Sequence, residues 1–143
     1  MREKRNAQVF LERVKLVDAI VHNKLIERQQ WSDLAVSITS NMGGEKVKSS
    51  GSQSKMADAV IRCHDMEAEI DRAVEKLIAE KREVTTTLEM LDSPSDYKLL
   101  HMRYIQYIDL KDIATKCGKD YTTITTYHGR ALRSLQAILD QKC

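Results

Sequence analysis

The chain has 143 residues, enough for one domain with a helical extension and too few for a multidomain enzyme. Its single Pro and five Gly are scarce against the roughly 12% that these residues make up in ordinary proteins, and aromatic residues are only 5% of the chain. This composition indicates long helices and excludes an all-β fold, while the net charge of +2 excludes a chain that is a polycation along its whole length.

Charge is unevenly distributed along the chain. Residues 1–41 carry a net charge of +2, residues 42–94 carry −3 and residues 95–143 carry +3. A basic C-terminal third beside an acidic middle favours an anion-binding surface at the C-terminal end. The alternative interpretation is ordinary solvated charge.

The first predicted helix runs from Ala7 to about Ser40. Apolar residues recur along it in steps of three and four, the spacing of one face of an α-helix, and the stripe is polar in the middle at Lys24 and Arg28. The apolar members of the stripe are Phe10, Val14, Val17, Val21, Trp31, Ala35 and Ile38.

A turn and a second long helix are predicted next. Residues 41–55 contain three of the five glycines and four serines, which favours a turn. The second helix is expected from near Ser54 to Ser93-Pro94, with five heptads of a coiled-coil pattern, so the two helices form a hairpin or pair with a second copy of the chain. The seam is Met56, Val60, Cys63, Glu67, Ile70, Val74, Leu77, Lys81, Val84, Leu88 and Leu91. The residues predicted to drive oligomerisation are Val60, Ile70, Val74, Leu77, Val84 and Leu88.

Three compact helices are predicted after the proline. Asp109 and Asp120 each precede one of them, where a carboxylate can accept the unpaired N–H groups of the first turn, and Gly118 stands at a favoured left-handed C-cap position. The connection 118–120 is then the three-residue turn of a helix-turn-helix. The expected helices are Asp96 to about Tyr107, Leu110 to Cys117 and Tyr121 to about Leu139.

The sequence therefore predicts an all-α fold, with a long helical hairpin for oligomerisation over residues 1–94 and a three-helix helix-turn-helix domain for DNA binding over residues 95–143. Ala114 is small enough for the two central helices to cross closely, while Ile113, Ile124, Tyr127, Ala131 and Leu132 supply a shared core.

The opposite face of the last helix suits a DNA major groove. Short hydroxyl and methyl groups there fit base edges, and flanking cations have the reach for phosphates. The predicted base-reading residues are Tyr121, Thr122, Thr123, Thr125 and Thr126. The predicted phosphate-binding residues are Lys111, Lys116, Lys119, Arg130 and Arg133.

At these residues the sequence resembles region 4, the C-terminal DNA-binding region of sigma-70-type RNA polymerase factors. The run Ser49–Val60 is similar to the hairpin of small sigma-like proteins encoded by phages and prophages of Gram-positive bacteria. The resemblance in the C-terminal third is carried by Arg103-Tyr104-Ile105, Asp112-Ile113-Ala114, Cys117-Gly118-Lys119-Asp120, Ile124, Tyr127 and Arg130-Ala131-Leu132-Arg133-Ser134-Leu135.

The resemblance implies a DNA-binding transcription regulator of phage or mobile-element genes, with host RNA polymerase as a further partner. No segment is similar to the aromatic-rich, promoter-melting region of full sigma factors, since the only Trp is Trp31 in the first helix. The alternative is a helical interaction protein, such as a phage assembly subunit or an inhibitor, that does not bind DNA.

No catalytic, cofactor or metal-binding motif is recognisable, so an enzyme with a small-molecule substrate is not expected. Cys63, Cys117 and Cys143 are an odd number without a C-x-x-C pair, which argues against disulfides and zinc and favours a reducing cytoplasm. No membrane helix is expected either. The sequence leaves open the operator, activation against repression, and any oligomeric state beyond a dimer.

Overall fold

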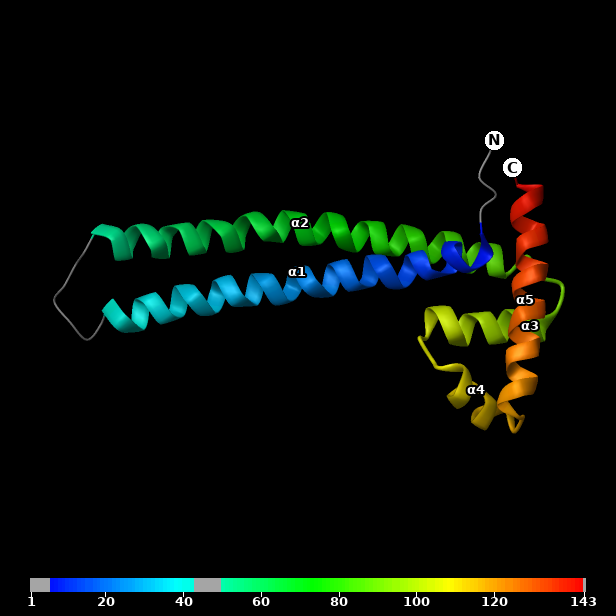
Figure 1. Cartoon of the computed structure of the whole chain (residues 1–143). Helices are drawn as coiled ribbons and strands as arrows, with labels where there is room; N and C mark the ends of the chain where they lie inside the picture. The colour runs from blue at the N-terminus through cyan, green and yellow to red at the C-terminus, as the bar shows by residue number, and fades with distance from the viewer. Residues whose placement is uncertain (1–5, 43–49, 143) are drawn as a thin grey trace. The chain divides into compact units, whose positions relative to one another are not determined.

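The computed structural model describes residues 6–42 and 50–142. The described part of the chain is all α-helical, contains no strand and begins with a long helical hairpin, which confirms the predicted fold class (Figure 1). The helical elements in chain order are α1 (Ala7–Met42), α2 (Ser50–Leu88), α3 (Pro94–Leu100), the π-helical turn η1 (His101–Ile105), α4 (Leu110–Cys117) and α5 (Tyr121–Gln141).

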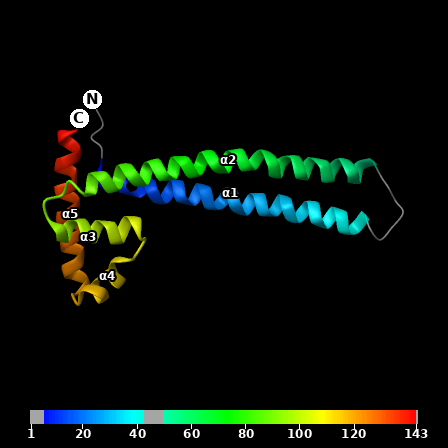
Figure 2. The ribbon, with the colours of Figure 1, turned by 180° about the vertical axis from the view of Figure 1, so that it is seen from behind.

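The chain divides into two compact units. The first unit comprises residues 1–17 and 77–143, so it joins the start of α1 and the end of α2 to all the C-terminal helices. The second comprises residues 18–76, the remainder of the hairpin. Within each unit, the segments of α1 and α2 run antiparallel and side by side, as both views show (Figures 1 and 2). The predicted boundary after residue 94 stays a prediction.

Helix α1 begins where the sequence predicts. The Asn6 side chain caps it, because Asn6 Oδ1 accepts hydrogen bonds from the backbone N–H groups of Gln8 at 2.9 Å and Val9 at 3.3 Å. Four members of the predicted stripe are buried, namely Phe10, Val14, Val17 and Val21.

Helix α2 begins earlier than the predicted position near Ser54. Residues 51–55 are helical, although their Ser and Gly content favours a turn. Gly51 lies in the first turn, where backbone N–H groups have no partner within the helix, and a Gly there costs only about 1 kcal/mol. Residues 43–49, which belong to the same predicted turn, lie outside the described residues, as does Cys143.

The predicted seam of α2 is wrong at two positions, Val60 and Glu67. Val60 is 52% exposed and Glu67 is also exposed, whereas the preceding residues, Ala59 and Met66, are both 0% exposed. A row of residues in steps of four and then three shares every seventh residue with a row in steps of three and then four. Both rows contain apolar residues in α2, so the spacing alone fits either row. The buried or half-buried seam is Met56, Ala59, Cys63, Met66, Ile70, Ala73, Leu77, Glu80, Val84 and Thr87.

The expectation that Pro94 ends the second helix is also wrong. Helix α2 ends at Leu88, and Pro94 is the first residue of α3. Ser93 is the N-cap of α3, with its side-chain oxygen accepting a hydrogen bond from Asp96 N at 3.4 Å. Pro is well suited to this position because the first turn of a helix needs no backbone donor.

The first unit contains two hydrophobic cores. The hairpin-base core joins α1, α2, α3, η1 and α5, and its buried members are Ala7, Phe10, Leu11, Val14, Val84, Leu88, Leu100, Tyr104, Ala131, Leu135 and Leu139. The second core, called the HTH core after the predicted helix-turn-helix, joins α3, η1, α4 and α5. Its buried members are Leu99, Met102, Ile113, Ala114 and Ile124.

Helix α5 contributes to both cores, with Ile124 in the HTH core and Ala131 in the hairpin-base core. Ala131 and Leu132 were expected in a core shared by the last helices alone. They pack instead in the hairpin-base core, because α5 is long enough to extend past α4.

The chain changes helical type between α3 and α4. In η1 the backbone N–H of Gln106 donates to His101 O at 3.1 Å, an i to i+5 hydrogen bond typical of a π-helix. Tyr107 then adopts a left-handed conformation with φ of 59°, which is unusual for a bulky residue and ends the helix. The single predicted helix from Asp96 to Tyr107 is therefore α3 followed by a π-turn.

Candidate nucleic-acid interface

The turn between α4 and α5 has the geometry that the sequence predicts. Gly118 has φ of 64° and ψ of 35°, a left-handed conformation that Gly adopts without a side-chain clash. The N–H of Gly118 donates to Thr115 O at 3.2 Å and the N–H of Lys119 donates to Ala114 O at 2.9 Å. These hydrogen bonds end α4 and redirect the chain into α5.

The predicted side-chain caps of α4 and α5 are wrong in detail. Asp109 and Asp120 do occupy the N-cap positions of α4 and α5 and have extended backbone angles. Neither side chain accepts a capping hydrogen bond. Their charges still lie at the helix N-termini, where a carboxylate is favoured by the helix dipole.

The buried side of α5 holds it against α4. Ile124 is 3% exposed, Ile113 is 0% exposed, and Ala114 is 4% exposed, so the small side chain lies where the helices approach. Tyr127 packs half-buried against the same core. These four residues confirm the core predicted for the turn.

The opposite side of α5 is exposed. Tyr121 is 50% exposed, and Thr122, Thr125 and Thr126 are exposed, whereas Thr123 is half-buried. The hydroxyls of Thr125 and Thr126 donate back to Tyr121 O and Thr122 O, at 2.9 and 3.0 Å. Their methyl groups and hydroxyl lone pairs are left for an external contact, a detail that the spacing of the sequence cannot give. Their role in reading bases stays a prediction.

All five predicted phosphate-binding residues are exposed. Arg130 lies over the ring of Tyr127, with its guanidinium carbon 4.9 Å from the ring centroid. Gly129 lies one turn from Arg133, whose Nη1 atom would be 3.8 Å from an added Cβ. The exposed cations are Lys111 and Lys116 of α4, Lys119 of the turn, and Arg130 and Arg133 of α5.

A partly buried polar pair joins η1 to α5. The Tyr104 hydroxyl and His128 Nε2 are 2.8 Å apart, and the two rings are stacked with centroids 5.7 Å apart. Burial lowers the pKa of His128, and the nearby Arg103 charge lowers it further. Burial likewise raises the pKa of the Tyr104 hydroxyl. His128 is therefore neutral at neutral pH, and the positive charge of α5 comes from its arginines.

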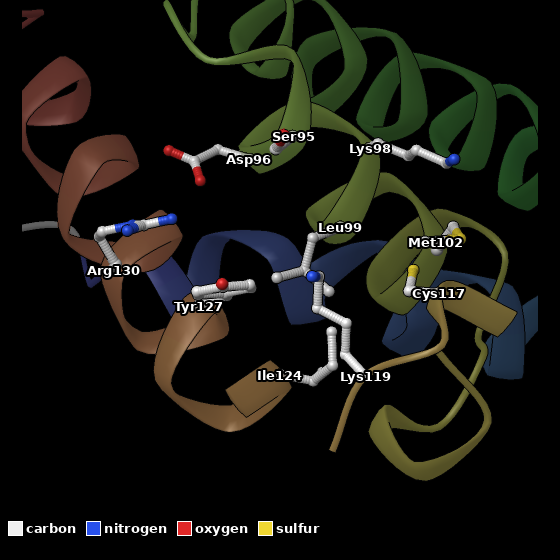
Figure 3. A pocket seen from close by; sticks show the side chains of 10 residues that line it. All are labelled: Ser95, Asp96, Lys98, Leu99, Met102, Cys117, Lys119, Ile124, Tyr127 and Arg130. Atoms are coloured by element: carbon white, nitrogen blue, oxygen red, sulfur yellow. The ribbon is translucent and has the colours of Figure 1, made fainter. Parts of the chain in front are cut away.

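A cleft of about 350 Å³ opens between α3 and the helix-turn-helix (Figure 3). Its floor is apolar, with Leu99 and Ile124 among its residues, and Lys119 and Arg130 of the predicted phosphate set line it. Asp96 also lines the cleft and is only 7% exposed. No sequence pattern predicts this cleft, because Asp96 and Arg130 are far apart in the chain and no motif connects them.

The predicted oligomerisation residues are divided by the structure. Val84 and Leu88 are 0% exposed inside the hairpin-base core, so they are covered by the same chain. Ile70 is buried, Leu77 and Val74 are half-buried, and Val60 is exposed.

The cysteines have different surroundings. Cys63 is half-buried at the hairpin seam, with its Sγ 3.7 Å from Arg28 O, while Cys117 is exposed at the end of α4. Within residues 6–42 and 50–142, no three His, Cys, Asp or Glu side chains are grouped to hold a metal ion. No helix in this part of the chain is long and apolar enough to cross a membrane.

Comparison with known proteins identifies one family. A family described as "Protein of unknown function (DUF1492)" matches residues 37–136, more than half of the chain. No curated protein and no solved structure matches the chain. The matched residues include α3, η1, α4, the turn and most of α5.

Proposed function

The chain belongs to the DUF1492 family, and we propose that it is a sequence-specific DNA-binding transcription regulator of phage or mobile-element genes. In this proposal, α5 enters the major groove as in region 4 of sigma-70-type factors, and host RNA polymerase is a further partner. The observation that carries the proposal is the α4–Gly118–α5 turn, with its buried side packed and its threonine side exposed between basic residues.

The charges on this face support DNA over a protein partner. Five exposed cations lie on α4, the turn and α5, and they are the groups that neutralise phosphates in protein–DNA interfaces. The exposed threonines between them offer methyl groups for thymine and hydroxyl oxygens for base donors. The alternative, a helical interaction protein without DNA binding, does not require exposed threonines to lie between basic residues.

The first test is filter binding of the full chain to duplex DNA at several salt concentrations. Because each neutralised phosphate releases counterions, we expect log K to fall linearly with log salt, with a slope of about 0.9 per phosphate contact. Sequences selected from a random pool of duplexes give the operator and its half-site spacing. Binding that does not depend on salt, or no binding at low salt, would favour the interaction protein.

Two substitutions assign roles to the side chains of α5. Arg130→Ala should weaken binding to all sequences alike and lower the salt slope by roughly one. Thr126→Ser keeps the hydroxyl that donates to Thr122 O and removes the methyl group. It should therefore change the preferred base at one position, by about 1 to 3 kcal/mol at most. The matched control is Arg72→Ala, an exposed arginine of α2 in the other unit, which should leave both properties unchanged.

A homo-oligomer is part of the proposal. The hairpin segment of residues 18–76 exposes large aliphatic side chains, including Leu25 at 47%, Val60 at 52% and Ile61 at 57%. These side chains are available for self-association through this unit, whereas Val84 and Leu88 are already covered by the same chain. Light scattering at micromolar concentration should give at least a dimer, and a mass of 16.4 kDa would contradict it.

A further inference from the structure

The cleft beside the helix-turn-helix has the composition of a small-molecule site. Its volume of about 350 Å³ is within the usual range of ligand pockets, which begins at roughly 300 Å³. Leu99, Met102 and Ile124 give it an apolar floor and belong to the HTH core, so the floor is fixed by packing. Polar groups approach it from α3, from the turn and from α5 (Figure 3).

One of these polar groups is a carboxylate that lines the cleft without a partner in the described part of the chain. Asp96 is 7% exposed, and its side chain makes no hydrogen bond or ion pair with any described residue. Figure 3 shows its carboxylate on the same side of the cleft as the Arg130 guanidinium, yet no ion pair joins them. The Asp96 oxygens are not among the fully buried side-chain atoms that lack a hydrogen-bond partner, so they face the open cleft, where a ligand that brings N–H donors can reach them.

The remaining groups suit a flat ring and a phosphate. The Arg130 guanidinium already lies on the Tyr127 ring, at 4.9 Å from its centroid, and a planar guanidinium is a good stacking surface for a base. Lys98 and Lys119 also line the cleft. Three cations and one carboxylate give the lining a net charge of +2, which complements the charge of a phosphate monoester near neutral pH.

We propose that this cleft binds a guanine mononucleotide. The guanine base carries two adjacent N–H donors on one edge, which match the two oxygens of the Asp96 carboxylate. The base stacks on Arg130 over the apolar floor, and the phosphate is held by Lys98 and Lys119. Adenine fits less well, because ring nitrogens that are acceptors flank its amino group and face the acceptor-only carboxylate.

The consequence for regulation rests on the proposed function. Lys119 and Arg130 are also two of the residues predicted to bind DNA phosphates, so a bound nucleotide occupies part of the DNA-binding surface. Guanine nucleotide should therefore lower DNA affinity and reduce the salt slope. The nucleotide is a ligand that competes for these side chains and is not converted.

The test is isothermal titration calorimetry of the full chain with GMP and, separately, AMP, in the absence of DNA. We expect one GMP per chain and weaker binding of AMP. Asp96→Asn should lower GMP affinity by about 10- to 100-fold, as for a lost hydrogen bond to a charged group, and should reduce the preference over AMP. The control Asp92→Asn removes the same charge from an exposed residue that does not line this cleft, and should leave affinity unchanged.

A second variant keeps the test valid if Asp96→Asn does not fold. Lys98→Gln changes an exposed side chain and should weaken GMP more than guanosine, which has no phosphate. Methyl NMR should place the GMP-induced shifts at Leu99, Met102 and Ile124. No binding at millimolar GMP, equal binding of AMP, or shifts elsewhere would overturn the proposal. DNA binding measured without nucleotide tests the proposed function alone. Failure of the GMP proposal can therefore be told apart from failure of the DNA-binding proposal.

Discussion

The two compact units are built from the same two long helices but are held together differently. In residues 1–17 and 77–143, apolar and aromatic side chains from helices distant in sequence form the hairpin-base core. Among the residues of 18–76 whose burial the structure describes, the buried apolar residues are Val21, Ala59, Met66 and Ile70. A coiled-coil pattern that continues along α2 therefore does not imply that the same kind of contact stabilises the helix along its whole length.

Ion pairs join α1 to α2 in residues 18–76. Arg28 pairs with Glu67 at 2.8 Å, and Arg62 pairs with Glu27 of α1 at 3.3 Å and with Glu69 of its own helix at 3.3 Å. Lys24 adds a longer contact of 3.6 Å to Glu69. These side chains are between 30% and 54% exposed, so solvent weakens their attraction. Residues 18–76 are therefore held by specific but weak contacts, and the first unit by close packing.

The largest expected effect comes from opening the hairpin-base core. Leu135 is 0% exposed, so Leu135→Ala removes apolar contact and leaves a cavity, which should cost about 2 to 5 kcal/mol of unfolding free energy. Urea denaturation followed by circular dichroism measures the loss. Ile78→Ala is the control, because Ile78 is 53% exposed in the same unit and should change stability by less than about 0.5 kcal/mol. Equal losses would mean that the core is not the source of stability in this unit.

A smaller effect is expected from the two glycines of the first unit. Gly118→Ala should cost about 1 to 2 kcal/mol, because φ of 64° is strained for any residue with a Cβ even though no atom lies within 4 Å. Gly129→Ala should stabilise by about 0.4 to 1 kcal/mol, because an added Cβ in α5 meets only Arg133 at 3.8 Å. Thermal denaturation should show a loss of stability for Gly118→Ala and a gain of stability for Gly129→Ala. A loss of stability in both variants would contradict this prediction.

Acid should destabilise the first unit through His128. Burial lowers its pKa in the folded chain below the ordinary value of about 6.5, so the unfolded chain binds more protons as the pH falls through that value. The stability present above about pH 6.5 is therefore lost progressively below it. Urea denaturation at about pH 7.5 and about pH 5.5 should show this loss, and His128→Gln should reduce it. An unchanged pH dependence in the variant would assign the effect to other groups.

The smallest effect is expected from salt, and it should fall on the second unit. Raising the salt concentration from about 0.05 M to about 0.5 M screens exposed ion pairs and leaves apolar packing intact. Hydrogen exchange should therefore become faster in residues 18–42 and 50–76 and stay unchanged near Leu88 and Leu135. Arg62→Gln should reproduce the change at low salt, because Arg62 contacts both Glu27 and Glu69. Equal acceleration of hydrogen exchange in both units would mean that ion pairs do not contribute more to residues 18–76 than to the first unit.

Much of the fold could be predicted from local patterns. The start of α1, the limits of α4, the left-handed Gly118 and the buried side of α5 all follow from rules that act within a few residues. The caps at Asp109 and Asp120 were predicted by position, but their hydrogen bonds were not formed, since a capping contact depends on the rotamer of one side chain.

The errors in α2 have a different origin. Val60 and Glu67 repeat every seven residues as regularly as Ala59 and Met66, and the spacing alone cannot choose between the two rows. The choice depends on the partner helix, where Arg28 receives Glu67 at the side of the hairpin. The cleft at Asp96 was unpredictable for the same reason, because it forms only when α3 and α5 pack together.

The backbone N–H of Ala7 donates a hydrogen bond of 2.9 Å to Gln136 Oε1, across 129 residues of sequence. This contact cannot form until almost the whole chain has been synthesised. At the usual rate of synthesis, roughly 6 to 26 s separate the appearance of these two residues on the ribosome. During this interval Phe10, Leu11 and Val14 can be covered by α2 but not yet by α5. We therefore expect the nascent chain to expose part of this apolar stripe until α5 has been made.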